Sequence, residues 1–549
     1  MEAYVRKVRR STAVASLALA SALALSACSS SDPDEGGAGT SATTDGGMST
    51  GIVTANGSEP QNPLVPTNTN EVGGGRILDM IFAGLVYYDA DGAPHNEVAE
   101  SIETEDGQNY TITIQDGWTF TDGTPVTASS FVDAWNYGAL LSNEQLSSYF
   151  FEPIVGFSYD EDSELTGLTV VDDTTFTVEL KQPESDFPLR LGYSAFFPLP
   201  EAAFADMDAF GENPIGNGPY MLDGEGAWEH NVKADLVPNP DYTGDRMAAN
   251  GGLSFVFYTT QDAAYNDLLA GQLDIVDAIP DSAFSTFESE LGDRAVNQPA
   301  AVFQSFTIPQ NLEHFSGEEG LLRRAAISKA INRQEITDAI FQGTRTPASD
   351  FTSPVIDGWS DSIPGSDVLT YDADAAKALW AEADAISPYE GTFTIGYNTD
   401  GGHQAWVDAV TNSIKNTLGI SAEGNPYATF ADLRTDVTER SITGAFRTGW
   451  QADYPSLYNF LGPIYATNAG SNDGDYSDAE FDSLLAKGAA ESDIDAANAE
   501  FQKAQEILFR DLPAIPLWYS NVTGGSADTV ENVQFGWNSV PLYYAVTKN

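Results

Sequence analysis

Strand-like and helix-like patterns alternate along most of this chain, and this alternation limits its possible folds more than any other feature. Strands are predicted at residues 110–114, 167–171, 175–180, 253–258 and 392–397, and several of them alternate apolar and polar residues, as half-buried strands do. Apolar residues spaced three and four apart predict helices at 127–135, 320–332, 372–384, 406–418 and 496–509. No repeat with a period of about 20–50 residues is present. The order predicts a mixed α/β protein with more than one lobe.

The first 27 residues have the pattern of an export signal. Basic residues cluster within the first ten positions, and an apolar run from Thr12 to Leu25 follows them. That run is too short for a membrane span but suits a signal peptide. It ends in LSAC at 25–28, which resembles a bacterial lipobox, so we expect Cys28 to carry a lipid anchor. An ordinary signal peptide with an incidental cysteine is the alternative.

A flexible tether is predicted over residues 28–50, which are rich in Ser, Gly, Thr and Asp. A G-x-S-x-G pattern at 47–51 overlaps the end of this segment without a preceding strand, so it is not a nucleophile elbow. No later run reaches about 18 apolar residues. We therefore expect a globular body on the extracytoplasmic face of the cell membrane, held by the lipid on Cys28.

Composition excludes several classes of function. The chain has 81 acidic and 24 basic residues, a formal net charge of −57, which argues against binding to nucleic acid or anionic lipid. Cys28 is the single cysteine, so no internal disulfide can form. The four histidines show no metal-binding spacing, and no phosphate-binding or dinucleotide motif is present. We expect no cofactor and no metal, and a binding protein rather than an enzyme.

Nine segments along the chain contain distinctive short motifs. The longest is YTITIQDGWTFTDGTPVTASSFVDAW at 110–135. The others are GLVYYDADGAPHNEVAES at 84–101, VVDDTTFTVEL at 170–180, NPIGNGPYML at 213–222, NPDYTGD at 239–245, AYNDLLAGQLDIVDAIP at 264–280, LLRRAAISKAINRQEI at 321–336, GWQADYPS at 449–456 and EILFRDLPAIPLWY at 506–519. Together they resemble the family 5 solute-binding proteins of ABC importers, the oligopeptide- and dipeptide-binding family. Ala83 and Asn332 depart from the family pattern, which has Glu and Asp there.

Glycines within these segments are expected to form turns. Gly123 lies in TDGTP and supplies an unusual backbone angle, and Gly216 and Gly218 are expected to act in the same way. The sequence LPAIPL at 512–517 is expected to end a helix before a strand.

The resemblance implies a two-lobed periplasmic-binding-protein type II (Venus-flytrap) fold, with an extra domain inserted in the first lobe. The expected boundaries are a signal peptide over 1–27, a tether over 28–50, lobe I over 51–88, 205–300 and 520–549, an inserted domain over 89–204, and lobe II over 301–519.

The resemblance also places a ligand site in FRTGWQADY at 446–454. In family members that bind free peptides, the matching residues imply that Asp453 pairs with the ligand ammonium. Gly449, Trp450 and Gln451 pair with the ligand main chain as an added strand. Arg447 meets the ligand carboxylate.

The family resemblance implies two further site positions. His403 follows YNTDGG at 397–402. In some oligopeptide binders, a histidine at the same spacing after Y-N-T lies near the ligand carboxylate. Tyr427 falls where a pocket aromatic is expected. Each site residue also has a structural alternative: a turn for Asp453, packing for Trp450 and Tyr427, a surface ion pair for Arg447, and a solvated loop for His403.

The expected function is a monomeric, lipid-anchored receptor that captures short peptides and delivers them to ABC permease and ATPase subunits. The same fold could instead bind an oligosaccharide, a nickel chelate or an opine, with Trp228, Trp359, Trp406, Trp450 or Tyr454 available for stacking. The sequence also leaves open a secreted hydrolase and a sensor lipoprotein without a transport role.

Overall fold

The computed structural model describes residues 49–399, 402–428, 430–491 and 493–548. These described residues form one compact unit. Cys28, the predicted signal peptide and nearly all of the predicted tether lie outside the described residues. Among the described residues, no helix has the length and apolar character needed to cross a bilayer.

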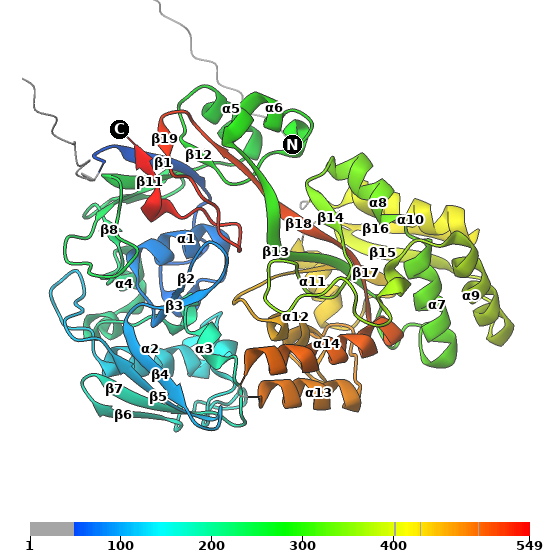
Figure 1. Ribbon diagram of the computed structural model, residues 1–549, viewed down its shortest axis with the longest axis horizontal. Helices are drawn as coiled ribbons and strands as arrows, with labels where there is room; N and C mark the ends of the chain where they lie inside the picture. The colour runs from blue at the N-terminus through cyan, green and yellow to red at the C-terminus, as the bar shows by residue number, and fades with distance from the viewer. Residues whose placement is uncertain (1–48, 400–401, 429, 492, 549) are drawn as a thin grey trace, which may run out of the picture. The chain divides into compact units, whose positions relative to one another are not determined.

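The largest sheet has twelve strands and contains the long strands β13 and β18 (Figure 1). Its main path, from one edge to the other, is β16 (Ser421–Tyr427), β15 (Thr392–Asn398), β17 (Ala445–Gln451), β13 (Ala295–Thr307), β18 (Ala514–Ser526), β12 (Ile275–Val276), β1 (Ile52–Gly57), β11 (Gly252–Phe257), β10 (Lys233–Pro238) and β8 (Tyr220–Leu222). Two short strands lie off this path, β14 (Arg345–Pro347) on β18 and β9 (Trp228–Glu229) on β10.

A separate antiparallel sheet forms within the segment predicted as an inserted domain. Its strand order is β4 (Ala99–Thr104), β5 (Asn109–Ile114), β7 (Thr175–Glu179) and β6 (Leu168–Asp172). Helix α2 (Ala128–Ala139) contacts β6 and β7, and buried Trp135 packs edge-on against Phe176. Two small pairs complete the strands: β2 (Val86–Tyr88) with β3 (Pro94–Asn96), and β19 (Val530–Glu531) with β20 (Thr547–Lys548).

Helices pack around these sheets. The α-helices are α1 (Val72–Ile81), α3 (Phe187–Arg190), α4 (Met207–Glu212), α5 (Gln261–Leu269), α6 (Phe287–Leu291), α7 (Gly317–Ala330), α8 (Arg333–Ile336), α9 (Ala373–Ile386), α10 (Gln404–Leu418), α11 (Phe430–Thr438), α12 (Leu457–Tyr465), α13 (Ala479–Ala489) and α14 (Ile494–Asp511). The five strands and five helices predicted from periodicity are confirmed, with small differences at their ends.

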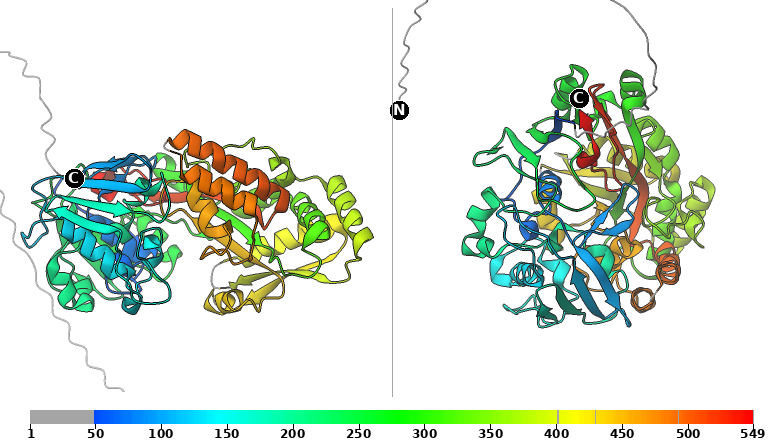
Figure 2. Two further views of the ribbon diagram at one scale, coloured as in Figure 1. Left: turned by 90° about the horizontal axis from the view of Figure 1, so that it is seen from below. Right: turned by 60° about the vertical axis from the view of Figure 1, so that its left-hand side comes forward.

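Two long strands connect the two main apolar cores. β13 and β18 lie side by side in Figures 1 and 2 and pair antiparallel over most of their length. Ala300 on β13 and Val522 on β18 belong to one core, while Phe306 and Leu517 belong to the other. The strand pairing shifts register between Pro299 and Phe303, close to the change of core. The described residues thus contain two main apolar cores joined by continuous strands, and the expected domain boundaries stay a prediction.

The glycine predictions have mixed outcomes. Gly123 has a φ of +84°, as predicted for its turn. The prediction for Gly216 and Gly218 is wrong, because neither lies among the residues with positive φ. These two glycines are instead required by close packing: a Cβ would lie 2.1 Å from the Ile81 carbonyl oxygen at Gly216, and 2.5 Å from the Ile81 carbonyl carbon at Gly218. The helix end before a strand is confirmed, since α14 ends at Asp511 and β18 begins at Ala514.

Candidate functional site

Strand β17 has an open edge along the segment predicted to bind ligand. On one side it pairs with β13 from Phe446 to Gln451, but β15 pairs with it only at Ala445 and Phe446. Beyond Phe446, no strand of the described residues covers the second side of β17. An open edge of this kind presents main-chain groups to which an extended peptide can pair.

The direction of the peptide groups on β17 follows from the strand alternation. The main-chain N–H of Ala452 donates to the Ala301 carbonyl oxygen at 2.9 Å, on the β13 side. Peptide groups along a strand point to alternate sides. Arg447, Gly449 and Gln451 therefore turn their N–H and C=O groups toward the open edge.

Buried Asn459 orients two of the predicted site residues. Its Oδ1 accepts hydrogen bonds from Trp450 Nε1 and from the main-chain N–H of Asp453, both at 3.0 Å. Its Nδ2 donates to Asp453 Oδ2 at 3.1 Å. Asn459 lies in the first turn of α12, which Ser456 caps at its N-terminus. One amide of a fixed helix thus holds both Trp450 and Asp453.

The carboxylate of Asp453 is only partly satisfied by the protein. Oδ1 makes no hydrogen bond or ion pair with any residue that the structure describes. Burial away from water raises the pKa of Asp453 to about 6, against the lowering effect of the Asn459 hydrogen bond. A cation placed beside Oδ1 would stabilise the ionised form.

Asp453 and Trp450 line a cavity of about 590 Å³, called here the Asp453 cavity. Its walls come from two distant parts of the chain, residues 149–190 and residues 450–471. Aromatic side chains are prominent among them: Tyr149, Phe150, Tyr159, Tyr454 and Tyr458. Broad aromatic walls suit the apolar part of a ligand and also favour a cation.

A buried ion cluster forms part of the wall of the Asp453 cavity. Arg190 Nη2 lies 2.6 Å from Glu184 Oε2 and 2.9 Å from Asp186 Oδ1. Its guanidinium also lies 5.2 Å from the Tyr454 ring centre and 5.7 Å from that of Tyr458. Burial by itself lowers the pKa of Arg190, but the two carboxylates outweigh this and raise it. Two acids share one base in this cluster.

A second cavity, of about 230 Å³, is lined by residues that include Arg447. We call it the Arg447 cavity. Arg447 Nε donates to Asn398 Oδ1 at 2.8 Å, and its guanidinium lies 4.7 Å from the Phe430 ring centre. Trp450 lines both cavities. A cavity with an arginine and a cavity with a partly satisfied aspartate thus meet at one indole.

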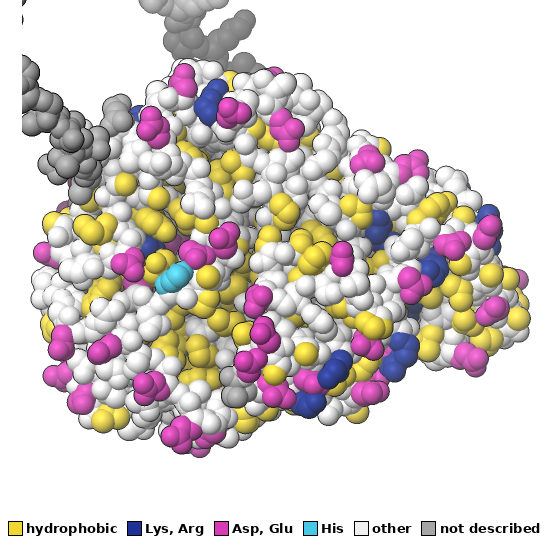
Figure 3. Space-filling model, in the orientation of Figure 1, with side chains coloured by type: hydrophobic (Ala, Val, Ile, Leu, Met, Phe, Trp, Pro, Cys, Tyr) yellow, Lys and Arg dark blue, Asp and Glu magenta, His cyan; other side chains and the backbone are white. Residues whose placement is uncertain are grey.

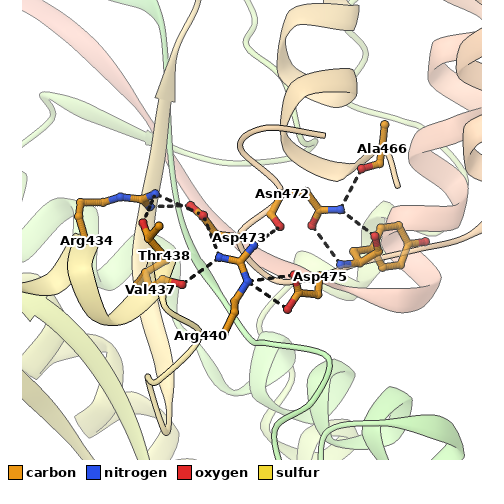
Figure 4. Close-up of polar contacts among 9 residues, drawn as sticks. Arg434, Val437, Thr438, Arg440, Ala466, Asn472, Asp473 and Asp475 are labelled. Carbon is orange, nitrogen blue, oxygen red and sulfur yellow. Dashed lines mark hydrogen bonds and ion pairs between the residues drawn. The ribbon is translucent and has the colours of Figure 1, made fainter. Parts of the chain in front are cut away.

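One wall of the Arg447 cavity is held by a set of ion pairs (Figure 4). Arg434 Nη1 lies 2.6 Å from Asp473 Oδ2, and Arg440 Nε lies 3.0 Å from Asp475 Oδ1. Asn472 Nδ2 donates to the Ala466 carbonyl oxygen at 2.9 Å. These contacts tie the loop before α13 to α11, so that Asp473 offsets the charge of Arg434.

Gln451, exposed at the end of β17, is already engaged through its side chain. Gln451 Nε2 donates to the Asn538 carbonyl oxygen at 3.2 Å. This contact joins the predicted ligand segment to the C-terminal part of the chain.

His403 and Tyr427 do not line either cavity. His403 precedes α10 and accepts a hydrogen bond at Nδ1 from Trp406 Nε1 at 3.0 Å. The Tyr427 hydroxyl donates to Asp436 Oδ2 at 2.9 Å, and its ring packs on a small core. Burial and the Asp436 contact raise the pKa of Tyr427 to about 12. These contacts give both side chains structural roles, and their ligand roles stay predictions.

Several residues of the candidate site were missed by the sequence interpretation. They are Asn459, Arg190 and the aromatic residues of segment 149–159. None belongs to a motif that marks chemistry, and residues as distant as Asp186 and Ser456, which are 270 positions apart, meet only in the fold.

Comparison with known proteins identifies similar chains of comparable length. A model of the family described as "Bacterial extracellular solute-binding proteins, family 5 Middle" matches residues 93–472, more than half of the chain. The oligopeptide-binding protein OppA of Bacillus subtilis (strain 168) is 26% identical over 495 residues, covering 86% of this chain and 88% of that protein. The probable deoxycholate-binding periplasmic protein YgiS of Escherichia coli (strain K12) is 28% identical over 494 residues, covering 84% and 87%.

A solved structure is similar in fold. The crystal structure of Haemophilus influenzae OppA in complex with RPPGFSPFR matches with a TM-score of 0.73 and 22% identity, over 91% of this chain and 99% of that chain. With the family match, this likeness confirms the predicted two-lobed type II fold.

Proposed function

The chain belongs to the family 5 bacterial extracellular solute-binding proteins, and on that premise we propose that it captures short peptides and delivers them to an ABC importer. One observation carries the proposal. The partly satisfied carboxylate of Asp453 faces an aromatic-walled cavity beside the open edge of β17.

A peptide presents three kinds of polar group, and the candidate site has a counterpart for each. Asp453 would pair with the ammonium, the open edge of β17 at Gly449 and Gln451 would pair with the main chain, and Arg447 would approach the carboxylate. Burying these ligand groups without partners would cost free energy, so the match matters for affinity. The Asp453 cavity leaves room for varied side chains.

The transport role extends the same proposal. OppA of Bacillus subtilis, by name, binds oligopeptides, and a family 5 protein would present its ligand to permease and ATPase subunits as a monomer. The LSAC sequence at 25–28 supports a lipid anchor on Cys28 at the extracytoplasmic face of the membrane. No bond is broken in this function, and no cofactor takes part.

Isothermal titration of the purified protein with tri-alanine, its N-acetyl form and its C-terminal amide tests the proposal. We expect micromolar binding of tri-alanine, equivalent to about −8 kcal/mol. Acetylation should weaken binding most, because it removes the ammonium that Asp453 meets. Equal affinities for all three compounds would contradict the assigned end contacts.

Mass spectrometry of small molecules released from the purified protein provides an independent test. A series of short peptides is the expected result. A single sugar, chelate or steroid acid, without peptides, would keep the fold but overturn the proposed ligand class.

A further inference from the structure

A third cavity lies beside α1, outside the two cavities described above. It has a volume of about 70 Å³ and is lined by Asp79, Tyr87, Tyr88, Arg246, Trp537 and Asn538, among others. This volume exceeds the space of a single water and accommodates a group of a few heavy atoms. We call it the Asp79 cavity.

The carboxylate of Asp79 is the unexplained group in this cavity. Asp79 lies in the last turn of α1, where the negative end of the helix dipole disfavours an acid. Its side chain is half-buried, yet its carboxylate makes no hydrogen bond or ion pair with any residue in the described part of the chain. Burial raises the pKa of Asp79 to about 6. Arg246 attracts this carboxylate and lowers its pKa against the effect of burial, but no hydrogen bond or ion pair with a described residue holds it.

The neighbouring base does not satisfy Asp79. Arg246 Nε and Nη2 lie 2.8 Å and 3.0 Å from the two carboxylate oxygens of Glu97. Arg246 Nη1 donates to the main-chain oxygen of Asp79 at 2.7 Å, and Nη2 also donates to that of Phe82 at 3.0 Å. Glu97 thus offsets the charge of Arg246, and the cavity keeps the negative charge of Asp79.

The Asp79 cavity adjoins the amino end of the proposed peptide site. Asn538, which lines the cavity, accepts the hydrogen bond from Gln451 at the end of β17. Tyr88 also lines it, and both Asp79 and Asp453 add to the effect of burial in raising the pKa of its phenol. The Asp79 cavity and the end of β17 are therefore in contact through Asn538.

We infer that the Asp79 cavity is a cation-accepting subsite, which takes the protonated amine or guanidinium of a basic side chain in the first two residues of the captured peptide. A cation there would pair with Asp79 and lie among the rings of Tyr87, Tyr88 and Trp537, an arrangement that favours cations. The inference rests on the proposed function, since it assumes that Asp453 holds the peptide amino end.

Titration with matched peptides tests this subsite. The probes are Lys-Ala-Ala and Ala-Lys-Ala, each compared with the peptide that has norleucine in place of lysine, a side chain of similar size without the charge. We expect at least one lysine peptide to bind about tenfold more tightly than its norleucine partner. In the Asp79→Asn variant this ratio should fall to near one.

Acidic side chains are spread over the face shown in Figure 3, so a lysine peptide could be attracted without any specific subsite. Two controls distinguish the subsite from this general attraction. Ala-Ala-Lys and its norleucine partner should differ little, because their third residue does not reach Asp79. The Asp91→Asn variant removes an exposed acid from the nearby turn and should keep the lysine preference. A preference independent of position, or unchanged in Asp79→Asn, would overturn the inference.

The outcomes also distinguish this inference from the proposed function. If neither lysine nor norleucine peptides bind, the peptide-binding proposal fails and takes the subsite with it. If both bind with equal affinity, peptide binding stands and the subsite is wrong. Because that comparison uses the unaltered protein, it decides the question even if Asp79→Asn fails to fold.

Discussion

Two aspartates of this protein, Asp350 and Asp453, share the same shift but not the same surroundings. Burial raises the pKa of each to about 6. Asp350 Oδ1 accepts hydrogen bonds from the main-chain N–H of Thr352 and from the Tyr519 hydroxyl, both at 2.8 Å. Its Oδ2 accepts from Thr352 Oγ1 at 2.6 Å. Asp453 receives a single side-chain bond, from Asn459 at 3.1 Å.

The difference shows why burial and a shifted pKa do not by themselves identify a binding residue. Asp350 is fully buried, and both its oxygens are used within the fold. Asp453 borders a cavity and keeps one oxygen for a ligand. Unused hydrogen-bonding capacity that faces a cavity is the informative feature.

The largest expected effect is on ligand affinity, in the Asp453→Asn variant. An ammonium enclosed in the site would lose its charged partner, at a cost of about 3 kcal/mol in binding free energy. Titration with tri-alanine measures this loss, and the melting temperature should change little. The matched control is Asp528→Asn, an exposed acid, which should bind as the unaltered protein does. Equal loss for tri-alanine and its N-acetyl form in Asp453→Asn would contradict the assignment.

The second effect is on stability, in the Asp350→Asn variant. The new amide NH₂ would face the N–H or hydroxyl donor of Thr352, so we expect the free energy of unfolding to fall by about 2 kcal/mol. Urea denaturation measures it. Peptide affinity of the folded variant should be unchanged, and a loss of affinity without a loss of stability would erase the distinction from Asp453.

The third effect is a pH dependence of binding. Only the ionised form of Asp453 attracts an ammonium, and its pKa of about 6 lies above the ordinary value of 3.8. As pH falls through 6, the carboxylate takes up a proton, so affinity for tri-alanine should be about tenfold weaker at pH 5 than at pH 7. The same raised pKa makes this group's contribution to stability decrease as pH rises from about 4 to about 6. Titration of tri-alanine at both pH values measures this change. The N-acetyl peptide is the control and should show no comparable change.

The smallest effect concerns the residue that orients Asp453. Asn459→Ala removes the bonds to Trp450 Nε1 and Asp453 Oδ2, so we expect affinity to fall by about 1 kcal/mol. Indole fluorescence should report a more mobile Trp450. An unchanged affinity would show that Asp453 needs no support from α12.

Local patterns accounted for much of the fold. The alternation in TFTIGY at 392–397 correctly predicted a strand. The apolar residues Trp406, Val410 and Ile414, spaced along one face, correctly predicted a helix, and all three are buried. The turn predicted at Gly123 is confirmed by its positive φ. For Gly216 and Gly218 the local interpretation failed, because the constraint comes from Ile81, a distant residue that the local pattern does not contain.

For the candidate site, the sequence supplied the segment but not its partners. The motif GWQADY located Asp453 and Trp450 through its family resemblance. Arg190 and Asn459 lie in segments that have no chemical signature, and Asp79 is one of 81 acidic residues. Nothing in the local sequence distinguishes Asp79 from Asp350, and only the family resemblance of GWQADY marks Asp453.

The sequence by itself determined the alternation of strands and helices, the family and the segment that carries the candidate site, because these depend on local periodicity and short motifs. Tertiary structure alone decided which carboxylates keep an unused oxygen. That property depends on partners such as Tyr519 for Asp350 and on the cavities beside Asp453 and Asp79. Hydrogen-bond satisfaction is set by which distant groups the fold brings within about 3 Å, and no local pattern encodes that distance.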